Sequence, residues 1–169
     1  MEPFRRRFHR WLVQDYHFAT AFLRFVSVLL SRSYRPQQPV LVQGIVALDD
    51  ELVWFEKHAK ARGLDLESPL HLVCRRYNDM MLRAVHEESL PGLYAMLYGI
   101  EACYLAAWSS LKLEGSHQEF IERWSDPRFR DYVVKLRTLA ESQTDATCQD
   151  LFDQCLRYEE VFWTMAMNG

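Results

Sequence analysis

The sequence predicts an all-α protein, a single-domain bundle of about seven helices that spans residues 1–169. Three observations predict this fold class. Apolar residues recur at three- and four-residue steps, the period of an α-helix, and no run alternates for long enough to form a strand. The chain contains only 6 Gly and 6 Pro, too few for a β-sandwich with its many turns. Its length of 169 residues, 49% of them apolar, is sufficient for one buried core.

Six short segments rich in residues that interrupt helices divide the chain. They are SYRPQQP (33–39), RGLDLESP (62–69), ESLPG (88–92), LEGSH (113–117), SDP (125–127) and ESQTDAT (141–147). The amphipathic helices between them are expected near 4–32, 40–61, 70–87, 92–112, 117–124, 127–141 and 146–166. The sixth helix has a well-marked start, because Asp126 is suited to cap a helix and Pro127 to occupy its first position.

The charge balance and the cysteines narrow the class of protein. Lys and Arg number 20 against 23 Asp and Glu, a net charge of -3, which argues against a general nucleic-acid binder. Apolar runs are far shorter than the ~20 residues of a membrane span, and the N-terminus lacks the apolar core of a signal peptide. Four cysteines follow no C-x-x-C spacing: Cys74, Cys103, Cys148 and Cys155. We therefore expect a cytoplasmic, reduced protein with neither nucleic acid nor membrane as a partner.

Three helices each carry one acid within an apolar stripe. The stripes are Phe4, Phe8, Trp11, Asp15, Phe18, Phe22 and Phe25 on the first helix, Leu97, Glu101, Tyr104 and Trp108 on the fourth, and Phe152, Cys155, Glu159, Phe162 and Ala166 on the last. Such a stripe faces the interior of a protein. Tyr77 lies in a similar stripe on the third helix.

Two interpretations of these acids are open. Each acid could pair with a group on a neighbouring helix, since buried ion pairs are common. If the stripes converge instead, the crowded carboxylates cannot all ionise, and at least one holds a proton near neutrality. That arrangement serves general acid–base chemistry. The aromatic lining then indicates a flat substrate, and the acids indicate one that carries amino groups.

The spacing of the ligand-type residues predicts no metal or cofactor. The 6 histidines include no H-x-x-x-H pair, and Glu114 and His117, with their E-x-x-H spacing, fall in an interruption. His17 lies two positions beyond Asp15 and off the aromatic stripe, so we expect a packing or surface role for it rather than haem ligation. Cys103 should point away from the acid of its own helix, and it is more typical of a small core residue than of a nucleophile.

Six segments resemble one known family, in order and over nearly the whole chain. They are WLVQDYHF (11–18), ELVWFEKHAKARGLD (51–65), PLHLVCRRYNDMML (69–82), LYGIEACY (97–104), RWSDPRFRDYV (123–133) and RYEEVFWTMA (157–166). Together they resemble the TenA family, thiaminase II of thiamin-pyrimidine salvage. The resemblance implies the all-helical haem-oxygenase-like fold and a homo-oligomer, either a dimer or a tetramer.

The resemblance also implies roles for particular side chains. Asp15 is implied to bind the amino group of a pyrimidine, and Glu159 to be catalytic. The other residues implied to contact the pyrimidine are Phe18, Tyr77, Tyr104, Trp124 and Phe162. Ile100 stands where the family has a nucleophilic cysteine. This resembles the cysteine-lacking branch, called TenA-E, so Glu101 is implied to be the second catalytic residue.

These features imply a cofactor-free C–N hydrolase of thiamin-derived aminopyrimidines or their formyl derivatives. Glu101 and Glu159 would share the proton transfers, with no assignment of acid and base. The missing thiol nucleophile argues against cleavage of thiamin itself, and the sequence leaves open which of these compounds is the true substrate. The alternative is a non-catalytic helical regulator of the same fold that binds a small molecule or a partner.

Overall fold

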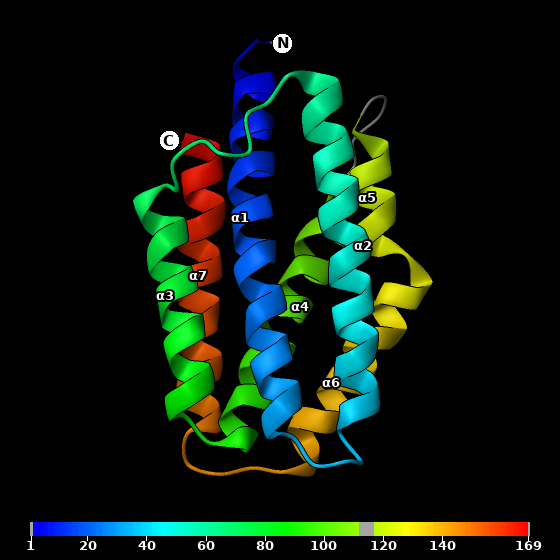
Figure 1. Ribbon diagram of the computed structural model, residues 1–169, viewed down its shortest axis with the longest axis vertical. Coiled ribbons are helices and arrows are strands. Elements are labelled where there is room, and N and C mark those ends of the chain that lie inside the picture. Colours follow the sequence, from blue (N-terminus) through cyan, green and yellow to red (C-terminus); the bar gives the residue numbers. More distant parts are fainter. Residues whose placement is uncertain (1, 112–116, 169) are drawn as a thin grey trace. The chain divides into compact units, whose positions relative to one another are not determined.

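A computed structural model describes residues 2–111 and 117–168, and these residues form helices joined by short connections, with no strand among them (Figure 1). The expected all-α class is confirmed. The helices are α1 (Glu2–Arg32), α2 (Gln38–Arg62), α3 (Leu72–Glu87), α4 (Leu90–Ser110), α5 (Gln118–Ser125), α6 (Pro127–Ser142) and α7 (Cys148–Asn168). Within the described residues, no helix has the length and apolarity that a membrane span requires.

The break between α5 and α6 decides the number of helices. Only Asp126 separates them, so the described helices number seven if α5 and α6 are counted apart and six if they form one broken helix. The predicted cap is confirmed, because the Asp126 side chain accepts a hydrogen bond of 2.7 Å from the Arg128 N–H and Pro127 is the first residue of α6. Residue 112, the expected end of the fourth helix, and Glu114 lie outside the described residues.

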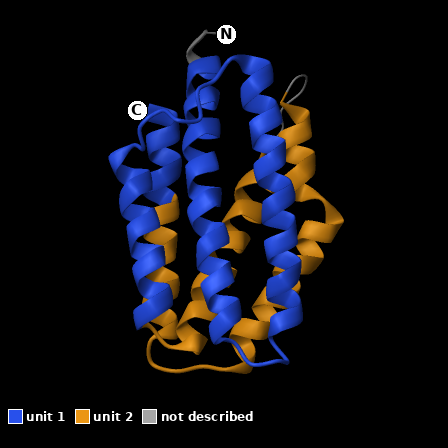
Figure 2. Cartoon of the chain, in the orientation of Figure 1, with its two compact units in different colours: residues 1–87, 160–169 blue, residues 88–159 orange. Residues whose placement is uncertain are grey.

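The contacts divide the chain into two compact units (Figure 2). Unit 1 comprises residues 1–87 and 160–169, and unit 2 comprises residues 88–159. The boundary falls within α7, whose first part belongs to unit 2 and whose last part belongs to unit 1. The expectation of one domain over residues 1–169 stays a prediction.

In unit 1, α1 lies between α2 and α3 and packs against both (Figure 1). The predicted stripe of α1 is buried from Phe8 to Phe25. Phe4 is an exception, since 44% of it is exposed, and its expected burial is wrong. Arg62, the last residue of α2, lies over the ring of Phe8 at 5.7 Å, and Phe4 lies one turn before Phe8 on α1.

The connection from α2 to α3 is held against α1. Gly63 ends α2 with a φ of 63°, a left-handed conformation that glycine adopts without strain. The buried side chain of Gln14 then donates to the Pro69 carbonyl at 3.2 Å and accepts from the His71 N–H at 2.8 Å. A ring nitrogen of His17 bonds the Ser68 carbonyl at 3.0 Å. His17 therefore has the packing role that its position predicts.

In unit 2, α4 is the central element and packs against α5 and α6. Its first half is buried on almost every face, as expected for a helix that is apolar all round. The first part of α7 approaches it closely at two glycines. A Cβ atom at Gly92 would lie 2.6 Å from Leu151, and one at Gly99 would lie 3.1 Å from the Phe152 ring. The glycines permit this close packing.

Candidate functional site

Unit 1 brings together four of the predicted site residues on α1, α3 and α7. Asp15 is 1% exposed, and Tyr77 has no exposed surface. The Phe18 ring lies 4.9 Å from that of Tyr77 and 5.8 Å from that of Phe162, measured between centroids. Phe22 stacks on the other side of Phe18 at 5.6 Å. The three helices thus form an aromatic cluster around Phe18, and a buried carboxylate lies one turn earlier on α1.

The face of α3 that meets Asp15 carries polar atoms. The Cys74 thiol donates to the Gln14 carbonyl at 3.4 Å, and the Asn78 amide donates to the His17 carbonyl at 3.4 Å. Burial, and then the negative charge of Asp15, raise the pKa of Cys74 to about 12. The Asn78 carbonyl oxygen is buried and has no hydrogen-bond partner among the described residues. Asp15 therefore lies in a buried region where the Asn78 carbonyl oxygen is an acceptor without a partner among the described residues.

Unit 2 contains both acids that the sequence predicts to be catalytic. Glu101 is a half-buried residue of α4, and Glu159, on α7, is 3% exposed. Burial, and then the negative charge of Glu159, raise the pKa of Cys103 to about 12. At neutral pH the Cys103 side chain is the thiol and not the thiolate that a nucleophile requires. Cys103 is therefore poorly suited to act as a nucleophile at neutral pH.

Aromatic rings from α4 and α5 pack together in unit 2. The Trp124 ring lies 6.0 Å from that of Tyr104 at a steep angle, and it stacks on Trp108 at 4.9 Å. Trp124 and Tyr104 are almost completely buried. Trp124 thus lies in a buried aromatic cluster, at the position where the resemblance implies a contact with the pyrimidine.

Sequence reasoning assigned no role to Tyr132, although the residue lies in one of the matching segments. It lies on α6 in unit 2, and its hydroxyl is buried with no hydrogen-bond partner among the described residues. Burial raises the pKa of this phenol well above 10, and the charge of Glu101 raises it further. Nothing in the sequence distinguishes Tyr132 from a core tyrosine. Its distinguishing feature is a hydroxyl without a described partner, which only the structure shows.

The predicted site residues thus form two groups, one within each unit. Unit 1 holds Asp15, Phe18, Tyr77 and Phe162, and unit 2 holds Glu101, Tyr104, Trp124 and Glu159. The expectation that their stripes converge on one cavity stays a prediction. In the part of the chain that the structure describes, no group of three or more His, Cys, Asp or Glu side chains could hold a metal ion.

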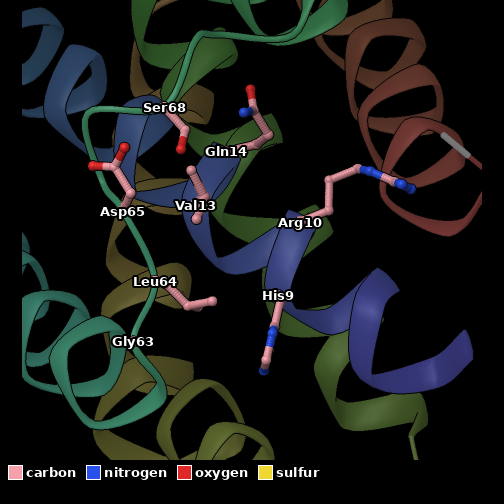
Figure 3. A pocket seen from close by; sticks show the side chains of 8 residues that line it. All are labelled: His9, Arg10, Val13, Gln14, Gly63, Leu64, Asp65 and Ser68. Carbon is pink, nitrogen blue, oxygen red and sulfur yellow. The ribbon is translucent and has the colours of Figure 1, made fainter. Parts of the chain in front are cut away.

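A groove on unit 1, about 320 Å³ in volume, contains none of the predicted site residues. Its lining consists of His9, Arg10, Val13, Gln14, Gly63, Leu64, Asp65 and Ser68. The side chains of Arg10 and Asp65 extend in opposite directions, and that of His9 extends away from both (Figure 3). The polar groups therefore do not converge on a common point, and we assign the groove no ligand.

The described residues thus form an all-helical protein that buries acids and phenols among aromatic rings. The model of the TENA/THI-4/PQQC family matches residues 4–169. The chain therefore belongs to the TENA/THI-4/PQQC family.

Individual relatives agree with this assignment. A Glycine max protein named "Probable bifunctional TENA-E protein" is 24% identical over 181 residues, which cover 96% of this chain and 79% of the relative. The solved structure of a TenA homologue from Pyrococcus furiosus is 29% identical, with a TM-score of 0.88 over 95% of this chain and 84% of that one. A structure from a Silicibacter species, described as a TenA family transcription regulator, has a TM-score of 0.84 at 19% identity and covers 98% of this chain and 83% of that one.

Proposed function

We propose that this protein is a cofactor-free hydrolase that breaks a C–N bond of a thiamin-derived aminopyrimidine. Membership of the TENA/THI-4/PQQC family and the relative named TENA-E favour a role in thiamin metabolism. The observation that carries the proposal is the pair of acids in unit 2, Glu101 and Glu159, on the inward-facing stripes of two helices. General acid–base hydrolysis needs two such groups.

The proposal includes the TenA-E branch, in which a glutamate replaces the nucleophilic cysteine. The chain has four cysteines, so the proposed branch depends on the residue at one position and not on the number of cysteines. That position holds Ile100, which is 1% exposed. Cys103, one turn further along α4, does not replace the missing nucleophile because its thiol stays protonated at neutral pH. Water is then the nucleophile that remains.

In the proposed reaction one of the two acids accepts a proton and the other donates one. A water molecule adds to the carbon that bears the leaving amine, so that a C–O bond forms as the C–N bond breaks. One carboxylate takes the proton that the water loses, and the other carboxyl group gives a proton to the amine. Each transfer contributes roughly 10²–10⁴-fold to the rate. The products are an alcohol and ammonia, or formate and an amine for the formyl derivative.

We propose that the residues of unit 1 recognise the pyrimidine in this reaction. The buried Asp15 would bind an amino group through a charge-assisted hydrogen bond. The aromatic cluster of Phe18, Tyr77 and Phe162 would contact the flat face of the ring. A ligand with both an amino group and a planar ring suits this combination.

A substrate screen tests the proposal. The purified full chain is incubated separately with thiamin, the aminomethylpyrimidine and its formyl derivative, and the products are separated by chromatography. We expect hydrolysis of at least one of the two aminopyrimidines and no cleavage of thiamin. The Glu159→Gln variant, purified in the same way, excludes a contaminating enzyme. Binding without turnover would instead support the regulator alternative, and cleavage of thiamin would contradict the TenA-E assignment.

A further inference from the structure

The hydroxyl of Tyr132 is a buried polar group that lacks a partner in the described part of the chain. The residue is 5% exposed, and its oxygen accepts and donates no hydrogen bond there. A buried hydroxyl without a partner destabilises the fold, whereas phenylalanine would fill the same space without that cost. The hydroxyl is therefore available to a group from outside the chain, either water or a ligand.

Tyr132 lies on the inward face of α6, the helix that packs against α4. Tyr132, Leu136 and Leu139 follow one another at helical spacing, and all three are buried. α4 carries Glu101. Burial raises the pKa of the Tyr132 phenol, and the negative charge of Glu101 raises it further. The phenol thus stays protonated at neutral pH and can donate a hydrogen bond, and it lies on a helix packed against the one that carries Glu101.

A phenol and a carboxylate are complementary partners for one water molecule. The phenol O–H donates to the water oxygen, and the water donates one O–H to the carboxylate. The second lone pair of the water oxygen remains available for attack on an electrophilic carbon. The carboxylate is then already in place to take the proton as the new C–O bond forms.

We propose that Tyr132 and Glu101 together hold the water molecule that attacks the substrate, with Tyr132 as a positioning residue and Glu101 as the base. The inference rests on the proposed hydrolase function and extends it by assigning the base. Glu159 is then the group that gives its proton to the leaving amine as the C–N bond breaks. Its deep burial suits this role, because burial favours the neutral form of a carboxyl group.

The Tyr132→Phe variant tests the inference, since it removes the hydroxyl and keeps the ring. On the pyrimidine that the wild type hydrolyses, we expect kcat to fall about 10- to 100-fold, the usual effect of a misplaced reactant. KM should stay within about twofold, because the phenol does not contact the pyrimidine. The urea midpoint should be unchanged or higher, because no hydrogen bond within the fold is lost.

Tyr98→Phe is the matched control. Tyr98 is a half-buried tyrosine of α4 in the same unit, its ring stacks on Phe152 at 6.0 Å, and its loss of a hydroxyl should leave kcat unchanged. A Tyr132→Phe enzyme with wild-type kcat would overturn the inference and leave the hydrolase function intact. A lowered urea midpoint would also overturn it, because the hydroxyl would then have a structural role. A wild type that hydrolyses none of the pyrimidines would overturn the proposed function and this inference with it.

Discussion

Cys74 and Cys103 each lie close to one of the acids predicted to be functional. Burial accounts for the larger part of their raised pKa values, both about 12, and the charges of Asp15 and Glu159 account for the rest. An unfolded cysteine ionises near pH 8.5. Between these two values the unfolded chain loses protons that the folded chain keeps, so unfolding becomes more favourable as the pH rises.

The first prediction concerns this pH dependence. The free energy of unfolding should fall as the pH rises from about 8.5, by up to ~1.4 kcal/mol per pH unit for each thiol. Cys103→Ser should therefore lose about 1–2 kcal/mol less stability than the wild type between pH 8 and pH 10. Urea denaturation of both proteins at pH 7, 8 and 10 measures the difference, with pH 7 as the internal reference. Equal losses would show that Cys103 ionises as freely in the folded protein as in the unfolded one.

The sequence predicts which side chains are buried where burial follows from the helical spacing of apolar residues. Asp15 and Glu159 occupy positions of apolar stripes, and both are buried as the period predicts. Tyr132 was not predictable, because a tyrosine in a stripe is an ordinary core residue until the surroundings of its hydroxyl are known. Phe4 was mispredicted because the period of α1 does not tell where its neighbour α2 ends.

The contact between α4 and α7 depends on Gly92, at the start of α4. A Cβ atom there would lie 2.6 Å from a methyl group of Leu151 and would collide with the Thr147 hydroxyl. That hydroxyl also bonds Ser89, the N-cap of α4, at 2.9 Å and Asp145 at 2.6 Å. A side chain at position 92 would therefore disturb the starts of both helices.

The second prediction is that Gly92→Ala lowers the free energy of unfolding by about 1–3 kcal/mol, the usual cost of overpacking. A loss of stability would be informative, because replacing glycine by alanine within a helix normally raises the free energy of unfolding by about 0.5–1 kcal/mol. Gly99→Ala is the control, since its Cβ atom would come no closer than 3.1 Å, to the Phe152 ring, and the substitution should cost less. Denaturation curves of the two variants and the wild type measure these free energies of unfolding. A Gly92→Ala protein more stable than the wild type would contradict the close packing.

Helix ends were predictable where the residues themselves set them. Gly63 ends α2, and Asp126 with Pro127 starts α6, each through a local backbone requirement. The same Asp126 makes the number of helices depend on definition, because a single residue between α5 and α6 breaks the helix without a true connection. Local signals of this kind fix ends, but they do not show which helices pack together.

The whole molecule contains two compact units, and this division was not predictable from the sequence. Helical period shows which face of a helix is buried, whereas the partner on that face depends on contacts between distant segments. The boundary within α7 falls between Glu159 and Glu160, where no Gly or Pro interrupts the helix to mark it. The predicted ring-binding residues lie in one unit and the predicted proton-transfer residues in the other.

The central claim of the proposed function is that Glu101 and Glu159 transfer the protons of a hydrolysis and that Asp15 binds its substrate. The test is steady-state hydrolysis of the aminomethylpyrimidine and its formyl derivative by four variants and the wild type. Asp15→Asn should raise KM and lower kcat together, because a poorly bound ring is also misplaced. Glu101→Gln and Glu159→Gln should lower kcat by roughly 10²–10⁴-fold with KM nearly unchanged, and Cys103→Ser should match the wild type. Loss of activity in Cys103→Ser, with full activity in Glu101→Gln, would contradict the account and identify a thiol enzyme instead.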